Sequence, residues 1–391
     1  MRESDEIIIK NMAESRGLSN ASYLGFKNVL RHYTNFQGKS LLELIEEAEN
    51  EEEEKIRWKN RTIKTRLISY MNYCKDNMTI NSAKHYLKLV KIFYHHHEIE
   101  IHKLPRFNDK NAKVRSPIQT SDLPTKEILC EAVEIADPLM QTLILFLASS
   151  GMSKIDALSL TIQDFIDATS RYHNSKDWKT AIEKMKEFEG EIIPVWHSRR
   201  KKTNKFFITF NSDEATRFMI HYLEYRNEKL RYNPKNKNKT LKPTDQLFKV
   251  SEQYFSVKFQ QLNDALGLGT IGDNPDDGVK GYNRLRGHIL RKFHASSLEK
   301  AGMDIYSINV MQGKSNGSVN DVYFFADEEV LLEKYINAMD GVLILSEVKE
   351  YDRYSPEFAE LENENKVLKD EIDDLKGDID NIKALLKSNR I

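Results

Sequence analysis

Four side chains in the last third of the sequence have the chemistry needed to transfer a phosphoryl group to a tyrosine. His288 and Arg291 stand three positions apart, which places both on one face of a helix. The imidazole of His288 is a candidate proton carrier, and the forked guanidinium of Arg291 matches the oxygens of a phosphate. Lys314 adds a cation, and Tyr323 follows as a candidate oxygen nucleophile. This chemistry needs no obligatory metal, because cations offset the phosphate charge and a side chain protonates the leaving oxygen.

A basic segment further upstream is predicted to form a hairpin turn. Residues 192–196 and 206–210 are rich in β-branched and aromatic side chains, and residues 199–205 between them are basic. A turn of this kind can enter a groove of DNA and deliver Lys202 to a phosphate. The candidate DNA-contacting residues beside it are Arg199, Arg200, Lys201 and Lys205. The alternative is an exposed basic hairpin without a catalytic role.

In this order and spacing the residues resemble the tyrosine recombinases, the phage-integrase and Xer-like family, in an archaeal or viral form. Four segments carry the resemblance: a first box at 150–160, an HxLR-type box at 286–296, a Leu-Gly-His-Ser-type box at 312–315 and a nucleophile segment at 322–324. The basic run 199–205 resembles the family's hairpin lysine segment. The resemblance covers roughly residues 120–345.

The sequence departs from the family pattern at two positions. The first-box arginine is absent: an ungapped alignment places Ser153 there, and a one-residue shift places Lys154 there. Lys154 would keep the charge of the arginine and lose its bidentate geometry. Lys314 stands where the family usually has His or Trp, and it can still donate to a phosphate oxygen.

The resemblance implies a role for each of these side chains. Tyr323 would attack a backbone phosphate of DNA and form a 3′-phosphotyrosyl link. Lys202 would protonate the leaving 5′ oxygen, and His288 would assist the movement of protons. Three cations would offset charge on the phosphate oxygens: Lys154, Arg291 and Lys314. No cofactor is implied, because rejoining the strand conserves the energy of the broken bond.

We expect a mainly α fold with a small β-sheet (α+β). Apolar residues recur at helical spacing through residues 1–105, which the resemblance interprets as a core-binding domain that clamps DNA. Residues 106–124 lack periodicity and are predicted to be a linker, and residues 125–350 would form the catalytic domain. A helix is also expected near 178–188. A generic helical bundle explains the N-terminal pattern equally well.

The residues from 355 to 391 are predicted to be a coiled-coil tail. Apolar side chains between 361 and 386 alternate at spacings of four and three, and a single Asn365 occupies an a position. Ile at a with Leu at d favours a parallel dimer, and acids at g stand five residues before lysines at e. The alternative is a single amphipathic helix that packs on the body of the protein.

Composition indicates a soluble cytoplasmic protein. Hydrophobic residues make up 40% of the chain and charged residues 30%, and no run approaches the length of a membrane span. The two cysteines, Cys74 and Cys130, are far apart, as expected in a reducing compartment. The formal net charge is −1, but basic residues gather near 199–205, 226–242 and 284–292. We expect no metal site, because the consecutive histidines 95–97 cannot all face one ion.

These inferences lead to three hypotheses. The first is a site-specific recombinase or integrase that acts on double-stranded DNA as a dimer to tetramer. The second is a catalytically impaired, recombinase-like dimer that binds DNA without cutting it, which the missing first-box arginine favours. The third is strand passage by the same tyrosine chemistry, as in type IB topoisomerases.

Overall fold

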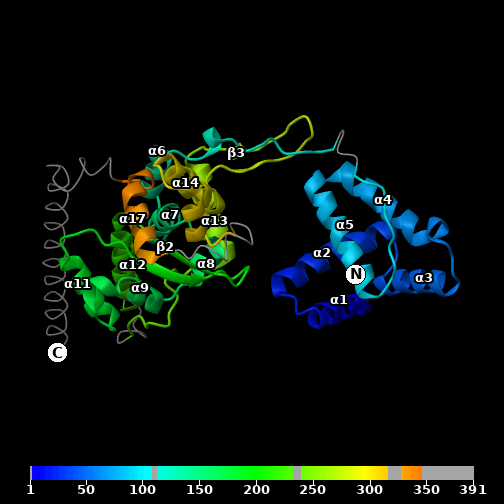
Figure 1. Cartoon of the computed structure of the whole chain (residues 1–391), viewed down its shortest axis with the longest axis horizontal. Helices are drawn as coiled ribbons and strands as arrows, with labels where there is room; N and C mark the ends of the chain where they lie inside the picture. Colours follow the sequence, from blue (N-terminus) through cyan, green and yellow to red (C-terminus); the bar gives the residue numbers. More distant parts are fainter. Residues whose placement is uncertain (1, 108–111, 232–238, 316–326, 346–391) are drawn as a thin grey trace, which may run out of the picture. The chain divides into compact units, whose positions relative to one another are not determined.

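The computed structural model describes residues 2–107, 112–231, 239–315 and 327–345. The described chain is mainly helical with a few short strands, which confirms the predicted fold class (Figure 1). It divides into two compact units. The first unit combines the residues up to Ile118 with Thr270–Tyr282, and the second combines Gln119–Gly269 with the residues from Asn283 onward. The predicted coiled coil at 361–386 lies outside the described residues.

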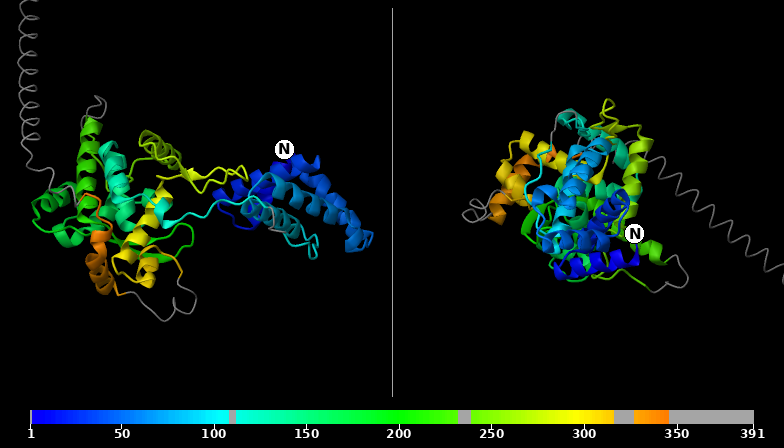
Figure 2. Two further views of the ribbon diagram at one scale, coloured as in Figure 1. Left: turned by 90° about the horizontal axis from the view of Figure 1, so that it is seen from above. Right: turned by 90° about the vertical axis from the view of Figure 1, so that its right-hand side faces the viewer.

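The helices of the first unit enclose one hydrophobic core (Figure 2). They are α1 (Glu3–Ser15), α2 (Asn20–Gln37), α3 (Leu41–Glu53), α4 (Thr62–Asn77) and α5 (Ile80–His96), with the short helix η1 (Trp58–Asn60) before α4. Tyr33 and Tyr94 join their hydroxyls across this core at 3.0 Å. Asp5 accepts a hydrogen bond from the backbone amide of Leu41 at 2.7 Å, so a buried carboxylate holds α1 at the start of α3. The predicted helical periodicity of this region is confirmed.

The first unit also takes in a segment from much later in the sequence. Residues 270–282 carry the short strands β3 (Thr270–Ile271) and β4 (Tyr282–Asn283). The segment that follows α5 contacts these residues. The guanidinium of Arg115 lies 4.2 Å from the ring centre of Tyr282, and Nη1 of Arg115 donates to the Tyr282 hydroxyl at 2.7 Å. The hydroxyl of Ser116 donates to the carbonyl of Asp273 at 2.6 Å. No periodicity in the sequence indicated this contact.

The second unit is built around α7 (Pro138–Ser150). This helix is apolar on all sides and is therefore buried, with α12 (Asp213–Arg231) and α14 (Gly287–Lys300) packed against it. The remaining elements surround this centre: η2 (Thr120–Asp122), α6 (Lys126–Glu134), α8 (Lys154–Leu158), α9 (Ile162–Ala168), α10 (Ser170–His173), α11 (Trp178–Glu187), α13 (Glu252–Ala265), α15 (Ile305–Met311), α17 (Glu328–Ala338) and η4 (Met339–Gly341). The helix expected near 178–188 is confirmed as α11.

The predicted hairpin is present, but its first strand is displaced along the sequence. Strand β1 (Val195–Arg199) pairs antiparallel with β2 (Phe206–Phe210), and Arg199 lies opposite Phe206. The prediction that residues 192–194 belong to the strand was wrong. The backbone amides of these residues are bonded elsewhere: that of Ile192 donates to Asp213, and that of Ile193 donates to the Tyr172 hydroxyl. Pro194 has no amide hydrogen to donate to a strand.

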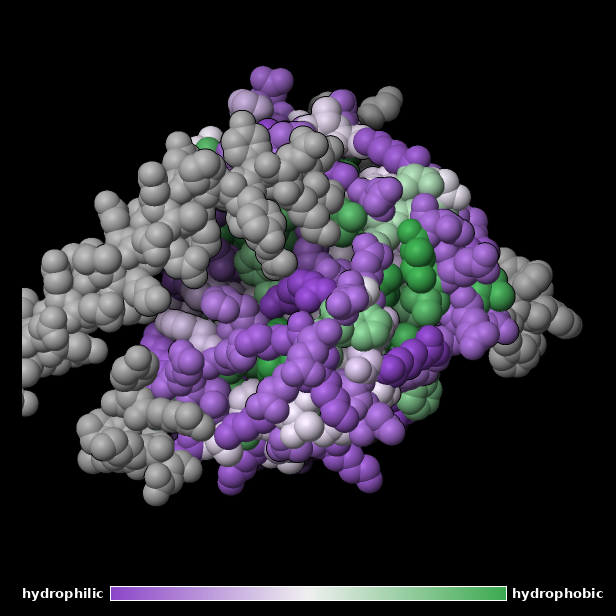
Figure 3. Space-filling view, turned by 90° about the vertical axis from the view of Figure 1, so that its left-hand side faces the viewer, coloured by the Kyte–Doolittle hydropathy of each residue, from purple (hydrophilic) through white to green (hydrophobic). Residues whose placement is uncertain are grey.

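Hydrophilic side chains predominate on the face of the molecule seen in Figure 3, and hydrophobic side chains show at several places between them. Within the described ranges, no helix combines the length and the apolar character needed to cross a membrane.

Candidate active site

The end of α7 forms the floor of the candidate site. Gly151 ends this helix with a left-handed backbone (φ 61°), and its amide donates to the carbonyl of Leu147 at 3.1 Å. A Cβ at this position would lie 2.5 Å from Nδ1 of His294, so only glycine fits between the helix end and that ring. The carbonyl of Gly151 accepts a hydrogen bond from Nη1 of Arg291 at 2.6 Å. The first box and the HxLR-type box therefore meet here.

Helix α14 supplies His288 and Arg291. Arg291 is 7% exposed, and its two terminal nitrogens donate to the carbonyls of Gly151 and Gln312. Burial, and then the charge of Arg200, lower the pKa of Arg291 to about 10. His288 is exposed one turn earlier. Protein atoms around the ring displace solvent, and this lowers the pKa of His288. Nearby cations, first among them Arg286, lower it further, so the neutral imidazole is favoured.

The turn after α15 supplies Lys314. The amide of Lys314 donates to the carbonyl of Asn309, and that of Gly313, which has φ 59°, donates to Val310. This pair of bonds is a Schellman ending, and it explains a glycine at 313. Lys314 is exposed, yet the surrounding protein atoms, and then the charges of Arg291 and Arg200, lower its pKa. Two guanidinium groups bond this turn, since Arg291 donates to the carbonyl of Gln312 and Arg200 donates to that of Gly313.

A buried polar pair behind Arg291 was missed at the sequence level. Nε2 of Gln312 donates to the carbonyl of Arg291 at 2.9 Å and lies 3.1 Å from Nδ1 of His294. Burial lowers the pKa of His294 to about 3, so this ring is neutral near pH 7. His294 stands three residues after Arg291, on the helix face that His288 and Arg291 already share. That spacing was the available signal.

The hairpin brings some of its basic residues to this cluster. Nη1 of Arg200 donates to the carbonyl of Gly313 at 3.1 Å, and Nζ of Lys205 donates to the carbonyl of Lys314 at 3.3 Å. Lys202 is exposed in the turn between the strands. Arg199 is also exposed and lies over the ring of Phe206, at 5.1 Å from its centre. Arg200 and Lys205 thus contact the Lys314 turn.

The first box provides an acid at the site and directs its lysine elsewhere. Asp156 is buried and accepts hydrogen bonds from the Ser153 hydroxyl at 2.6 Å and from the Lys201 amide at 2.9 Å. Ser153 is also the N-cap residue of α8. Nζ of Lys154 lies 3.0 Å from a carboxylate oxygen of Glu252 on α13. The box therefore positions the hairpin through Asp156, while Lys154 forms an ion pair with a different helix.

Together these contacts gather positive charge beside the end of α7, which makes this part of the second unit a candidate anion-binding site. Arg200, Arg291 and Lys314 contribute three positive charges, and Asp156 contributes one negative charge near Arg200 and Arg291. The surplus of positive charge favours an anion with several oxygens, such as a phosphate. Tyr323, the predicted nucleophile, lies outside the described residues. Within the part of the chain that the structure describes, no group of three His, Cys, Asp or Glu side chains could hold a metal ion.

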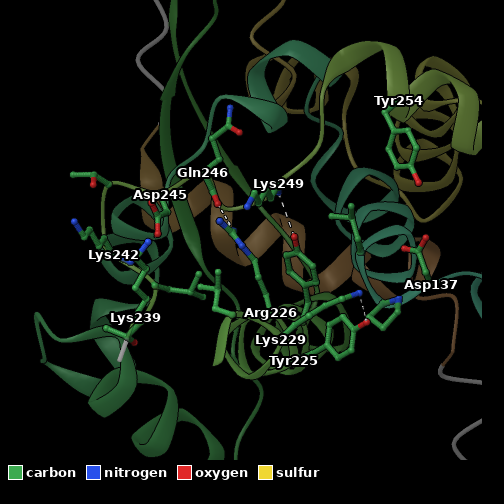
Figure 4. A pocket seen from close by; sticks show the side chains of 17 residues that line it. Asp137, Tyr225, Arg226, Lys229, Lys239, Lys242, Asp245, Gln246, Lys249 and Tyr254 are labelled. Carbon is green, nitrogen blue, oxygen red and sulfur yellow. Dashed lines mark hydrogen bonds between the residues drawn. The ribbon is translucent and has the colours of Figure 1, made fainter. Parts of the chain in front are cut away.

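A hollow lies in the second unit at the start of α7, the end opposite Gly151. It has a volume of about 1070 Å³, and Asp137 and Pro138 at the start of the helix line it (Figure 4). Five basic side chains also line it: Arg226, Lys229, Lys239, Lys242 and Lys249. Arg226 is directed into the protein, where its Nη1 donates to the carbonyl of Leu247 at 3.1 Å. Four of the basic residues that the sequence gathers near 226–242 line this hollow: Arg226, Lys229, Lys239 and Lys242. None of Arg200, Arg291 and Lys314 lines it.

Solved structures similar to this chain are recombinases and integrases. The crystal structure of XerA recombinase is 15% identical, with a TM-score of 0.33, and the match covers 90% of this chain and 99% of that one. The XerH site-specific recombinase in a post-cleavage complex with palindromic difH substrate is 14% identical, with a TM-score of 0.47 over 83% of this chain and 82% of that one. The Tn1549 transposon integrase bound to transposon right end DNA is 12% identical, with a TM-score of 0.45 over 85% of this chain and 99% of that one.

No family model matches the sequence, and no curated protein matches it.

Proposed function

We propose that this protein is a site-specific DNA recombinase or integrase. The observation that carries the proposal is the convergence of Arg200 and Arg291 on the Lys314 turn beside the end of α7, since Arg291 donates to the carbonyls of Gly151 and Gln312 and Arg200 donates to that of Gly313. The segments that converge are the ones that resemble the boxes of tyrosine recombinases. A surplus of guanidinium and ammonium groups suits the backbone phosphate of DNA.

In the proposed reaction the phenolic oxygen of Tyr323 bonds to a backbone phosphorus as the bond to the 5′ oxygen breaks. The phenol loses its proton through His288, and the leaving 5′ oxygen gains a proton from Lys202. The product is a 3′-phosphotyrosyl link, which the 5′ hydroxyl of a second strand reverses. Arg291 and Lys314 stabilise the charge that develops on the phosphate oxygens. DNA is the partner, and protomers pair on it.

The test is a covalent adduct on nicked DNA. Duplexes from either side of the encoding gene, nicked so that the cleaved fragment diffuses away, would trap the tyrosyl intermediate. Wild-type protein is expected to form an adduct, and Tyr323→Phe is expected to bind these duplexes equally well without forming one. Tyr335→Phe is the matched control, because Tyr335 is fully buried and its hydroxyl donates to the carbonyl of Ser149. An adduct in Tyr323→Phe would refute the assignment of the nucleophile.

A second candidate function is DNA binding without cleavage. The ion pair between Lys154 and Glu252 favours it, because this contact engages the first-box lysine with a carboxylate of α13. Tight binding of the nicked duplexes by wild-type protein, with no adduct, would support this candidate over the recombinase. Relaxation of supercoiled plasmid without dependence on a site would instead support topoisomerase-like strand passage.

A further inference from the structure

We propose that Arg200, from the turn after β1, is the second catalytic guanidinium of this site and acts in place of the arginine that the first box lacks. The inference rests on the proposed function, since it names a group that would contact the phosphate being cleaved. The sequence alone indicates only a general DNA contact for Arg200 and makes Lys154 the candidate for the missing charge.

The packing of Arg200 against Gly313 directs its guanidinium toward the cluster. The side chain is 16% exposed, and a Cβ on Gly313 would lie 2.7 Å from its Cδ and 2.9 Å from its Cγ. The aliphatic stem thus lies directly on the glycine of the Lys314 turn. Nη1 then donates to the carbonyl of Gly313. Glycine at 313 therefore has two roles, the left-handed helix ending and the close approach of Arg200.

The acid beside Arg200 is already engaged by other donors. Nε of Arg200 lies 3.8 Å from Oδ2 of Asp156, beyond hydrogen-bond distance, and this nitrogen is buried without a hydrogen-bond partner among the described residues. The same Oδ2 accepts from Ser153, and Oδ1 accepts from the Lys201 amide. Asp156 therefore anchors the turn of the hairpin, and the guanidinium keeps donor capacity for another acceptor.

Electrostatic coupling places Arg200 with the other cations. Its charge lowers the pKa of Arg291 and also that of Lys314. Like charges held this close destabilise the folded protein unless an anion joins them, so the arrangement is suited to binding one. A backbone phosphate supplies the oxygens that two guanidinium groups and an ammonium group can share.

Lys154 and Ser153 do not serve this purpose in the structure. Lys154 is paired with Glu252, and the short side chain of Ser153 caps α8 and donates to Asp156. The guanidinium is consequently supplied by the hairpin instead of the first box. Arg200 could also act only as a structural anchor of the hairpin. Replacing the scissile phosphate with a methylphosphonate separates this role from a catalytic one.

The experiment compares cleavage of two nicked duplexes that trap the wild-type adduct. One carries the natural scissile phosphate, and the other carries a methylphosphonate, in which a neutral methyl replaces one charged oxygen. Arg200→Met keeps the apolar stem over Gly313 and removes the charge. Its single-turnover cleavage of the phosphate should fall about 10²- to 10³-fold. On the methylphosphonate its rate should come within a few-fold of wild type, because less charge then needs to be offset.

Arg217→Met is the matched control. Arg217 also pairs with a carboxylate, at 2.9 Å from Asp213, and donates to a glycine carbonyl, that of Gly190, at 3.1 Å. Its loss removes a guanidinium beside a carboxylate and a bond to a glycine carbonyl, but none of these is in the cluster, so cleavage of both substrates should stay near wild type. Arg200→Lys should recover only part of the phosphate rate, because the fork geometry is lost.

Three outcomes would overturn the inference. Wild-type cleavage of the phosphate by Arg200→Met would assign Arg200 no catalytic role, while the proposed function would stand. Equal slowing of Arg200→Met on both substrates would make Arg200 a structural anchor, again without affecting the proposed function. The absence of any adduct with wild-type protein would refute the proposed function and this inference together.

Discussion

Replacing His294 with glutamine should change how the stability of the second unit responds to acid. The ring is buried against Gly151, and its pKa is lowered from 6.5 to about 3. The unfolded chain therefore takes up a proton below pH 6.5 that the folded chain refuses. The stability that the neutral ring contributes is fully present above pH 6.5 and is lost progressively as the pH falls toward 3.

The magnitude follows from the width of that window. Each pH unit between the two pKa values corresponds to about 1.4 kcal/mol, so lowering the pH from 6.5 to 4.5 should cost wild type roughly 3 kcal/mol through His294 alone. His294→Gln has no such proton to bind. Over the same pH range, the free energy of unfolding of His294→Gln should therefore decrease by roughly 3 kcal/mol less than that of wild type. This difference does not depend on the stability of the variant at pH 7.

Urea unfolding followed by tryptophan fluorescence measures this difference. Trp178 and Trp196 lie in the core of the second unit, and Trp58 lies in the first, so a Trp58→Phe background makes the signal report the second unit alone. Wild type and His294→Gln would be compared at several pH values between 7 and 4.5. Parallel curves of unfolding free energy against pH would refute the reasoning, because they would mean that His294 titrates alike in the folded and unfolded states.

Three further predictions concern stability and assembly. Gly151→Ala should destabilise the second unit by roughly 2–4 kcal/mol in the same urea assay, because its methyl would meet the His294 ring. Gly267→Ala, with a similar φ of 62° and open space around it, should cost only about 1 kcal/mol. Equal losses in the two variants would contradict the contact between Gly151 and His294. Tyr335→Phe should lose about 1–2 kcal/mol by leaving the buried carbonyl of Ser149 without its donor, and an unchanged urea midpoint would count against that bond. Deleting residues 355–391 should weaken self-association in sedimentation while single-site DNA binding persists; identical sedimentation of the full and truncated chains across concentration would exclude a dimerising tail.

Local patterns predicted the helices of the first unit, one helix of the second unit and the hairpin. Helical periodicity predicted the helices of the first unit, and the helix expected near 178–188 is α11. The hairpin was predicted from its β-rich segments, but the start of β1 was not. Residues 192–194 do not pair as a strand, because the amides of Ile192 and Ile193 donate to Asp213 and Tyr172 instead. These two partners are distant in the sequence from the strand segment.

The sequence by itself determined which residue types are available to the site: a histidine and an arginine on one helix face, a Gly-Lys turn and a basic hairpin. It could not determine which cation occupies which place, since that depends on contacts between segments far apart in the chain. Only the tertiary structure pairs Lys154 with Glu252 and brings Arg200 onto Gly313, 113 residues away in sequence. The physical reason is that helical and strand periodicity encode the face on which a side chain lies, whereas a guanidinium is positioned by whichever carbonyl and carboxylate the folded chain brings beside it.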